Sequence, residues 1–182
     1  MSQALLIIDI QNDYFPGGAM ELVCSPEAGR KAGQLLAAFR ARQLPVIHIQ
    51  HISTRPGGTF LRPGTPGAEI HPCVAPAGSE PVFCKHYPNS FRDTGLLAWL
   101  QEHKVTRLVI AGMMTHMCVD TTVRAAFDIG LACTLAHDAC ATRDLAFGRQ
   151  TATAEQVQTA YVVALGALFA RALAVEEIVA QL

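Results

Sequence analysis

Five short apolar runs, separated by segments with helical spacing, constrain the fold of this chain more than any other feature. Two of these runs, Ala4–Ile8 and Arg107–Ala111, are almost continuously apolar rather than alternating, which is typical of a strand buried on both faces. Such strands alternating with helices predict an α/β fold built on a doubly wound, mostly parallel sheet with right-handed crossovers. The predicted strands are Ala4–Asp9, Pro45–His51, Pro81–His86, Arg107–Ala111 and Leu131–Asp138, and the predicted helices are Pro26–Arg42, Thr94–His103, Thr121–Ile129 and Thr153–Ala172.

Three other segments complete the prediction. Asp13–Gly18 reads as a loop because of its Pro and Gly residues. Ser53–Ser79 is rich in the same residues and is expected to be a long ordered loop, and loops of this length inside a compact domain are usually functional. Val175–Val179 is interpreted as a short closing element, with an edge strand as one option.

The length and composition indicate one domain over residues 1–182 with a sizeable core. Hydrophobic residues make up 51% of the chain and charged residues only 16%, which favours a sheet covered on both faces and further surface buried between subunits. The formal net charge is −1 without a long basic or acidic run, so nucleic acid and anionic membranes are not expected partners.

The cysteines indicate the compartment. Six are present, with no CxxC pair and no signal peptide before them, and no apolar run is long enough to cross a membrane. We therefore expect a soluble, cytoplasmic protein with reduced thiols.

Cys118 lies where a buried strand is predicted to turn into a helix. The unpaired N–H groups and positive dipole end of a helix start favour the thiolate, which is the nucleophilic form of cysteine. The same N–H groups could receive an oxyanion. A small buried hydrophobic residue is the alternative interpretation, and this position alone does not decide between the two.

Three chemically capable residues fall at the carboxyl ends of predicted strands: Asp9, Lys85 and, after the turn, Cys118. Ligands bind outside these ends in parallel α/β sheets. Each residue alone has an ordinary structural explanation, such as a turn residue or a solvated lysine. Together they offer a base, an orienting cation and a nucleophile.

Longer motifs around these residues carry a family resemblance. They are Asp9–Tyr14 with Pro16–Gly18, Lys85 followed by Ser90–Phe91, and Gly112–Val119 continuing to Thr122 and Arg124. In this order and spacing the chain resembles the isochorismatase-like cysteine hydrolase superfamily, whose members include nicotinamidases, N-carbamoylsarcosine amidohydrolases and streptothricin hydrolase. The resemblance extends from about Leu5 to Asp144.

The resemblance implies a six-stranded, mostly parallel sheet in a Rossmann-like three-layer α/β/α sandwich, assembled as a homodimer or homotetramer. It implies that Asp9, Lys85 and Cys118 form a catalytic triad and that the Met113–Met114 peptide bond is cis. The backbone N–H groups of Met114 and Cys118 would then form an oxyanion hole. The implied activity is cleavage of a C–N bond in a small amide, ureido or carbamoyl compound through a thioester.

Several other residues are candidates for the substrate pocket. Tyr14 occupies a position where relatives often place a ring-stacking aromatic, and Tyr87 and His116 are candidate substrate contacts. Adjacent turn residues rarely point at one another, so His116 is not expected to form a dyad with Cys118.

No metal and no other cofactor is expected. Nicotinamidases carry an Asp-x-His metal-binding pattern after the second strand, whereas this chain has Gln50–Ser53 without an aspartate. A metal would then depend on His51 and His71 with no firmly placed carboxylate, which is a poor site.

Three alternatives stay open at this point. One is an isochorismatase-type hydrolase of a different small substrate, and another is thiol redox chemistry at Cys118, which would need a resolving cysteine close in space. The third is a non-catalytic module that binds a small molecule or a protein on the same fold. The sequence identifies neither the substrate nor the pathway.

Overall fold

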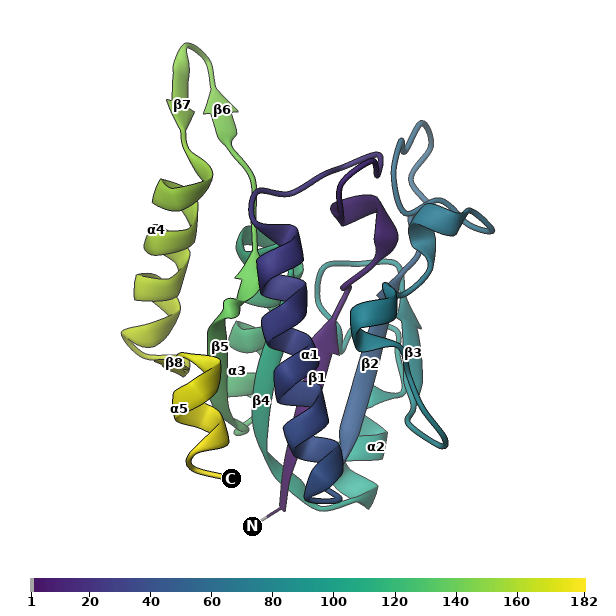
Figure 1. Ribbon diagram of the computed structural model, residues 1–182, viewed down its shortest axis with the longest axis vertical. Coiled ribbons are helices and arrows are strands. Elements are labelled where there is room, and N and C mark those ends of the chain that lie inside the picture. The colour runs from purple at the N-terminus through teal and green to yellow at the C-terminus, as the bar shows by residue number, and fades with distance from the viewer. Residues whose placement is uncertain (1) are drawn as a thin grey trace.

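The computed structural model describes residues 2–182 and contains a six-stranded sheet that is parallel throughout. The strand order is β3-β2-β1-β4-β5-β8, so the order reverses next to β1 (Figure 1). The strands are β1 (Ser2–Ile8), β2 (Val46–His51), β3 (Val82–Lys85), β4 (Val105–Met113), β5 (Ala132–Ala141) and β8 (Arg171–Leu173). The predicted α/β class and the six-stranded sheet are confirmed.

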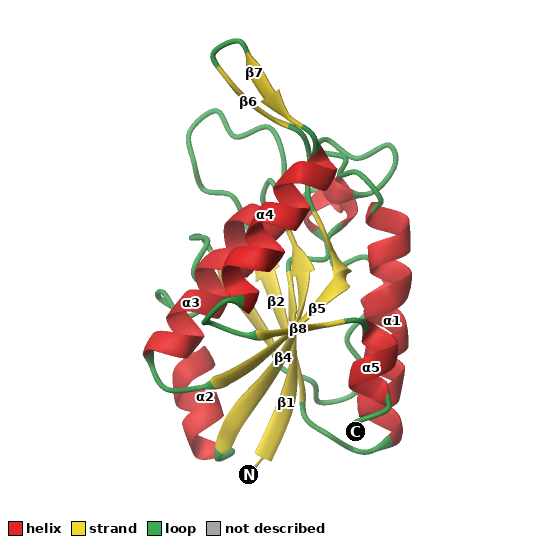
Figure 2. Cartoon of the chain, turned by 90° about the vertical axis from the view of Figure 1, so that its left-hand side faces the viewer, coloured by secondary structure: helices red, strands yellow, loops and turns green. Residues whose placement is uncertain are grey.

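Helices cover both faces of this sheet, as a continuously apolar strand requires. Figure 2 shows α1 and α5 on one side of the strands and α2, α3 and α4 on the other. The helices are α1 (Ser25–Ala41), α2 (Leu96–Glu102), α3 (Asp120–Asp128), α4 (Ala154–Gly166) and α5 (Val175–Val179). The layers therefore follow the predicted three-layer sandwich. No helix among residues 2–182 is long and apolar enough to span a bilayer.

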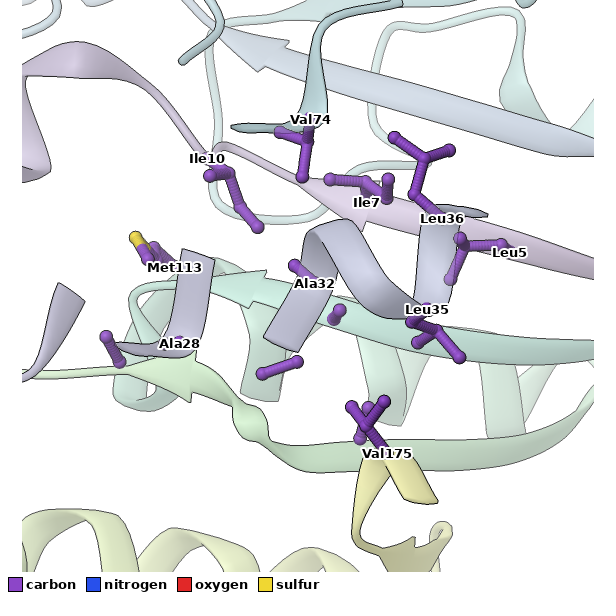
Figure 3. Packing of buried hydrophobic residues seen from close by; sticks show 14 of the residues in the cluster. Leu5, Ile7, Ile10, Ala28, Ala32, Leu35, Leu36, Val74, Met113 and Val175 are labelled. Atoms are coloured by element: carbon purple, nitrogen blue, oxygen red, sulfur yellow. The ribbon is translucent and has the colours of Figure 1, made fainter. Parts of the chain in front are cut away.

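Two apolar clusters form the core, one on each face of the sheet. Successive residues of β1 point to opposite faces, so Leu5 and Ile7 join the cluster beneath α1, while Leu6 and Ile8 join the other. Leu35 of α1 packs toward the sheet in the first cluster (Figure 3). All five of these side chains are essentially fully buried, so the sheet is anchored from both sides.

The carboxyl-terminal part of the chain differs from the prediction. The Ala-rich run predicts a helix to Ala172, but α4 ends at Gly166 and the Leu165 carbonyl accepts the N–H groups of Phe169 and Ala170. The chain then supplies the edge strand β8, because pairing with β5 outweighs local helix propensity. Val175–Val179, for which an edge strand was one option, is the helix α5.

Several short elements were absent from the prediction. The hairpin of β6 (Leu145–Phe147) and β7 (Gln150–Ala152) projects from the body above α4 (Figure 1). Three turns of 3₁₀ helix lie in segments predicted as loops: η1 (Asn12–Tyr14), η2 (Pro66–Ala68) and η3 (Pro72–Val74). The long loop is ordered partly by the Asp13 carboxylate, which accepts the backbone N–H of Leu61 at 2.6 Å.

Candidate active site

The structure brings the Asp9, Lys85 and Cys118 side chains together at the carboxyl edge of the sheet. Asp9 follows β1, Lys85 ends β3, and Cys118 lies in a single turn of π-helix, η4 (Thr115–Val119), after β4. The Lys85 Nζ atom donates to Asp9 Oδ2 at 2.6 Å and to Cys118 Sγ at 3.1 Å. Because β2 lies between β3 and β1, only a side chain as long as that of Lys85 reaches from β3 to the Asp9 carboxylate.

All three groups are withdrawn from water: Asp9 is 0% exposed, Lys85 1% and Cys118 6%. A buried charge is tolerated only when it is paired and hydrogen-bonded. The carboxylate and the ammonium satisfy this condition for each other. Asp9 Oδ1, however, is buried without a hydrogen-bond partner among residues 2–182, and so remains free to accept a proton.

The backbones of β1 and β4 approach each other very closely next to the site. Ile8 of β1 pairs with Gly112 of β4, and a Cβ atom at Gly112 would lie 2.3 Å from the Ile8 carbonyl oxygen. Only glycine fits this approach. Asp9 follows directly with a φ of 51°, so its side chain leaves the line of the strand. The Met113–Met114 peptide bond is cis, as the family resemblance implies.

The surroundings of Cys118 do not favour the thiolate in the way that a helix start would. Burial raises the pKa of the Cys118 thiol far above its ordinary value, and the negative charge of Asp9 raises it further, whereas Lys85 opposes both. The residue also lies in the π turn rather than in the first turn of α3. Burial and Asp9 therefore favour the neutral thiol, which needs a base to become nucleophilic.

Lys85 keeps its positive charge despite burial. Burial by itself would lower the pKa of the ammonium, but the charges and hydrogen bonds of Asp9 and Cys118 raise that pKa above its ordinary value. The resting site is thus an ion pair of carboxylate and ammonium beside a protonated thiol.

Sequence analysis missed His51 as a member of this group. Its Nδ1 atom lies 3.0 Å from Lys85 Nζ. Burial, and then the charge of Lys85, lower the pKa of His51 to about 4, so the imidazole is neutral near neutral pH. The register between β2 and β3 sets His51 directly beside Lys85, and this register is a feature of the fold that neither strand's own sequence shows.

We tested whether these side chains could hold a metal ion. Asp9, His51 and Cys118 offer ligand atoms that all lie within 4.8 Å of one another. The Lys85 ammonium contacts all three residues, so these donors already surround a positive charge and do not fit a further cation. His71 lies apart from them, stacked on Phe15 at 3.6 Å between ring centroids.

The three candidate substrate contacts have different surroundings. Tyr14 is only 2% exposed, and burial, followed by the charges of Cys118 and Asp9, raises the pKa of its phenol. The half-buried His116 places Nδ1 2.6 Å from the hydroxyl of Thr142. Tyr87 is 36% exposed and the Arg92 guanidinium covers its ring. Their contact with a substrate stays a prediction.

Comparison with known proteins agrees with this geometry. The model of the isochorismatase domain matches residues 3–166. The chain belongs to the isochorismatase family. The uncharacterised isochorismatase family protein YddQ of Bacillus subtilis is 46% identical over 93% of this chain and 94% of its own length. Nicotinamidases and an N-carbamoylsarcosine amidase are among the more distant matches.

Two further relatives of this isochorismatase-family chain are informative. A streptothricin hydrolase from Streptomyces noursei is 40% identical over 79% of this chain, which spans 51% of that enzyme. The crystal structure of a proposed isochorismatase hydrolase from Oleispira antarctica superposes with a TM-score of 0.95 at 46% identity, covering 98% of this chain and 96% of the other. The chain is therefore an isochorismatase-family hydrolase with a triad-like arrangement of Asp9, Lys85 and Cys118.

Proposed function

We propose that this protein is a cysteine-dependent hydrolase that cleaves the C–N bond of a small amide, ureido or carbamoyl compound through a thioester. One observation carries the proposal: a buried ammonium joins a carboxylate at 2.6 Å and a sulfur at 3.1 Å. This set contains a nucleophile, a base and an orienting cation. The relative that is a streptothricin hydrolase supports a proposal of hydrolytic chemistry.

The first half of the proposed reaction forms the acyl-enzyme. Asp9 removes the proton from Cys118 as the sulfur attacks the carbonyl carbon, and the backbone N–H groups of Met114 and Cys118 receive the oxyanion. When the tetrahedral intermediate collapses, the C–N bond breaks and Asp9 returns the proton to the leaving amine. The product of this half is a thioester on Cys118.

The second half releases the acid. Asp9 takes a proton from a water molecule, whose oxygen attacks the thioester carbon. The C–S bond then breaks, and the proton returns to the sulfur of Cys118. The overall change is amide plus water to carboxylic acid plus amine. The Lys85 ammonium holds the Asp9 carboxylate in place and offsets negative charge on the sulfur.

The surroundings of the site extend the proposal to partners. We propose a small-molecule substrate that contacts Tyr14, Tyr87 and His116, and a homodimer or homotetramer in which exposed apolar residues such as Val163 and Leu168, each 64% exposed, are covered. The six cysteines are all free thiols, which supports a cytoplasmic location.

The decisive experiment is a screen of small amides, ureido and carbamoyl compounds, followed by intact-mass analysis after acid quench. We expect one acyl adduct per chain, located at Cys118 by peptide mapping and lost in Cys118→Ser. The control is Cys24→Ser, which removes an exposed thiol outside the site and should keep both adduct and turnover. Full turnover in Cys118→Ala would refute the proposal.

A further inference from the structure

The Lys85 ammonium has three N–H donors, and the proposed triad uses only two of them. The third is directed to His51, whose Nδ1 atom lies 3.0 Å from Lys85 Nζ. We propose that His51 is a positioning residue: its Nδ1 atom accepts the third N–H and so fixes the ammonium between Asp9 and Cys118. The chemical role in this inference rests on the proposed function, whereas the contact between His51 and Lys85 is observed independently of that function.

The main chain holds His51 in place with little freedom. His51 of β2 is paired directly with Lys85 of β3. The Gln11 side chain accepts the His51 backbone N–H at 2.8 Å and donates to the His51 carbonyl at 2.9 Å. Gln11 is itself fully buried and also donates to the Ala68 carbonyl at 2.7 Å. Gln11, two residues after Asp9, therefore fixes the end of β2 through hydrogen bonds.

The contact with Lys85 specifies which tautomer His51 adopts. An ammonium can only donate, so Nδ1 must carry the lone pair and Nε2 must carry the proton. A protonated imidazole could not accept this hydrogen bond. The charged and titratable groups that act on His51 are Lys85, Asp9 and His86, and burial together with Lys85 keeps the imidazole neutral.

Removing this acceptor has a defined consequence. A buried N–H of Lys85 would lose its partner, and leaving a buried donor unsatisfied is costly. The ammonium would then turn toward other acceptors, and its 3.1 Å contact with Cys118 Sγ would loosen. Less positive charge beside the sulfur means less stabilisation of the thiolate.

The first test uses the wild-type protein and needs no substrate. Long-range ¹H–¹⁵N correlation spectra of uniformly ¹⁵N-labelled protein report the tautomer of each of the seven histidines, and His51 is assigned as the signal lost in His51→Asn. We expect the neutral Nε2–H tautomer at pH 7. An Nδ1–H tautomer or an imidazolium at that pH would overturn the proposal.

The second test measures alkylation of Cys118 by iodoacetamide as a function of pH, with peptide mapping to separate Cys118 from the exposed Cys24 and Cys84. His51→Leu should shift the profile upward by about one pH unit, which lowers the alkylation rate about tenfold at pH values below the transition. His51→Asn, whose amide oxygen can replace Nδ1 as acceptor, should stay near wild type.

The matched control is His86→Leu, which removes the exposed imidazole one residue after Lys85 and should leave the profile unchanged. If His51→Leu does not fold, His51→Ala with added imidazole replaces it, and the free imidazole should restore the wild-type profile. An unshifted profile in His51→Leu, or no rescue of His51→Ala, overturns the positioning role. Alkylation is measured without turnover, so a negative alkylation result for His51 does not contradict the hydrolase proposal. A negative amide screen likewise leaves the alkylation test of His51 interpretable.

Discussion

At the scale of single residues, the site is a small electrostatic network with almost no access to water. The carboxylate of Asp9 and the ammonium of Lys85 form an ion pair, and the Nδ1 atom of His51 contacts the same ammonium. Burial favours the neutral thiol of Cys118. Burial and the charge of Lys85 together lower the pKa of His51, while burial and the charge of Asp9 together raise the pKa of Cys118. Altering one member should therefore change both the stability and the chemistry of the rest.

Asp9→Asn tests this coupling. We expect turnover to fall by at least about a thousandfold, because the amide cannot accept the thiol proton. Stability should fall by about 3–5 kcal/mol, because the Lys85 ammonium is left buried without a counter-charge. Urea unfolding and steady-state kinetics measure the two effects. The double variant Asp9→Asn/Lys85→Met should recover stability and not activity, and equal stability of the single and double variants would contradict the coupling.

At the scale of elements, the site depends on how closely two neighbouring strands approach. β1 and β4 pair without interruption from Gln3 and Arg107 to Ile8 and Gly112, and this last pair directly precedes Asp9 and Met113 in sequence. Position 112 requires glycine, because a Cβ atom there would clash with backbone atoms of Ile8. This closeness brings the Asp9 carboxylate, which follows β1, near the η4 turn that follows β4 and holds Cys118.

Gly112→Ala should therefore be more harmful than a typical glycine substitution. We expect a loss of at least about 2 kcal/mol in unfolding free energy, since β1 and β4 must separate, together with loss of turnover. The control is Gly166→Ala at the end of α4, where a Cβ would make only an ordinary 3.6 Å contact with Ala172. That change should stay within about 1 kcal/mol of wild type, and similar losses in both variants would argue against the proposed approach of the strands.

At the scale of the whole molecule, an ion network away from the site links a helix to the sheet. Glu80 accepts hydrogen bonds from Arg40 of α1 and lies 2.9 Å from the His48 imidazole of β2. The Arg40 hydrogen bonds are the main reason that the pKa of Glu80 is lowered to about 2. Since the folded pKa lies below the unfolded one, this carboxylate stabilises the fold above about pH 4.5.

The pH dependence of stability should reveal this network. Its contribution is lost as the pH falls from about 4.5 toward 2, because the unfolded chain then binds the proton more readily. Full conversion of the pKa difference would give about 3 kcal/mol, and solvent screening around the partly exposed Arg40 reduces this to about 1–2 kcal/mol. Urea unfolding of wild type and Glu80→Gln should differ by that amount at pH 7 and converge near pH 2. A constant difference across this range would contradict the assignment.

Much of this architecture could be predicted from sequence, and the failures have physical reasons. Short apolar runs predicted the five strands from β1 to β5, and the carboxyl ends of these strands pointed to Asp9, Lys85 and Cys118. Local propensity failed at Arg171–Leu173, where pairing with β5 converts an apparent helix end into a strand. The role of His51 depends on a cross-strand register, and the protonation of Cys118 depends on burial, neither of which one residue's neighbours in sequence reveal.

The separation of the reactive groups along the chain has a consequence for how the protein is made. Lys85 meets a partner 76 residues earlier and another 33 residues later, at or beyond the ends of three different strands. In a nascent chain the Cys118 thiol has no base beside it until β4 pairs with β1. Attack on an amide by that sulfur therefore requires the ends of β1, β3 and β4 to have come together.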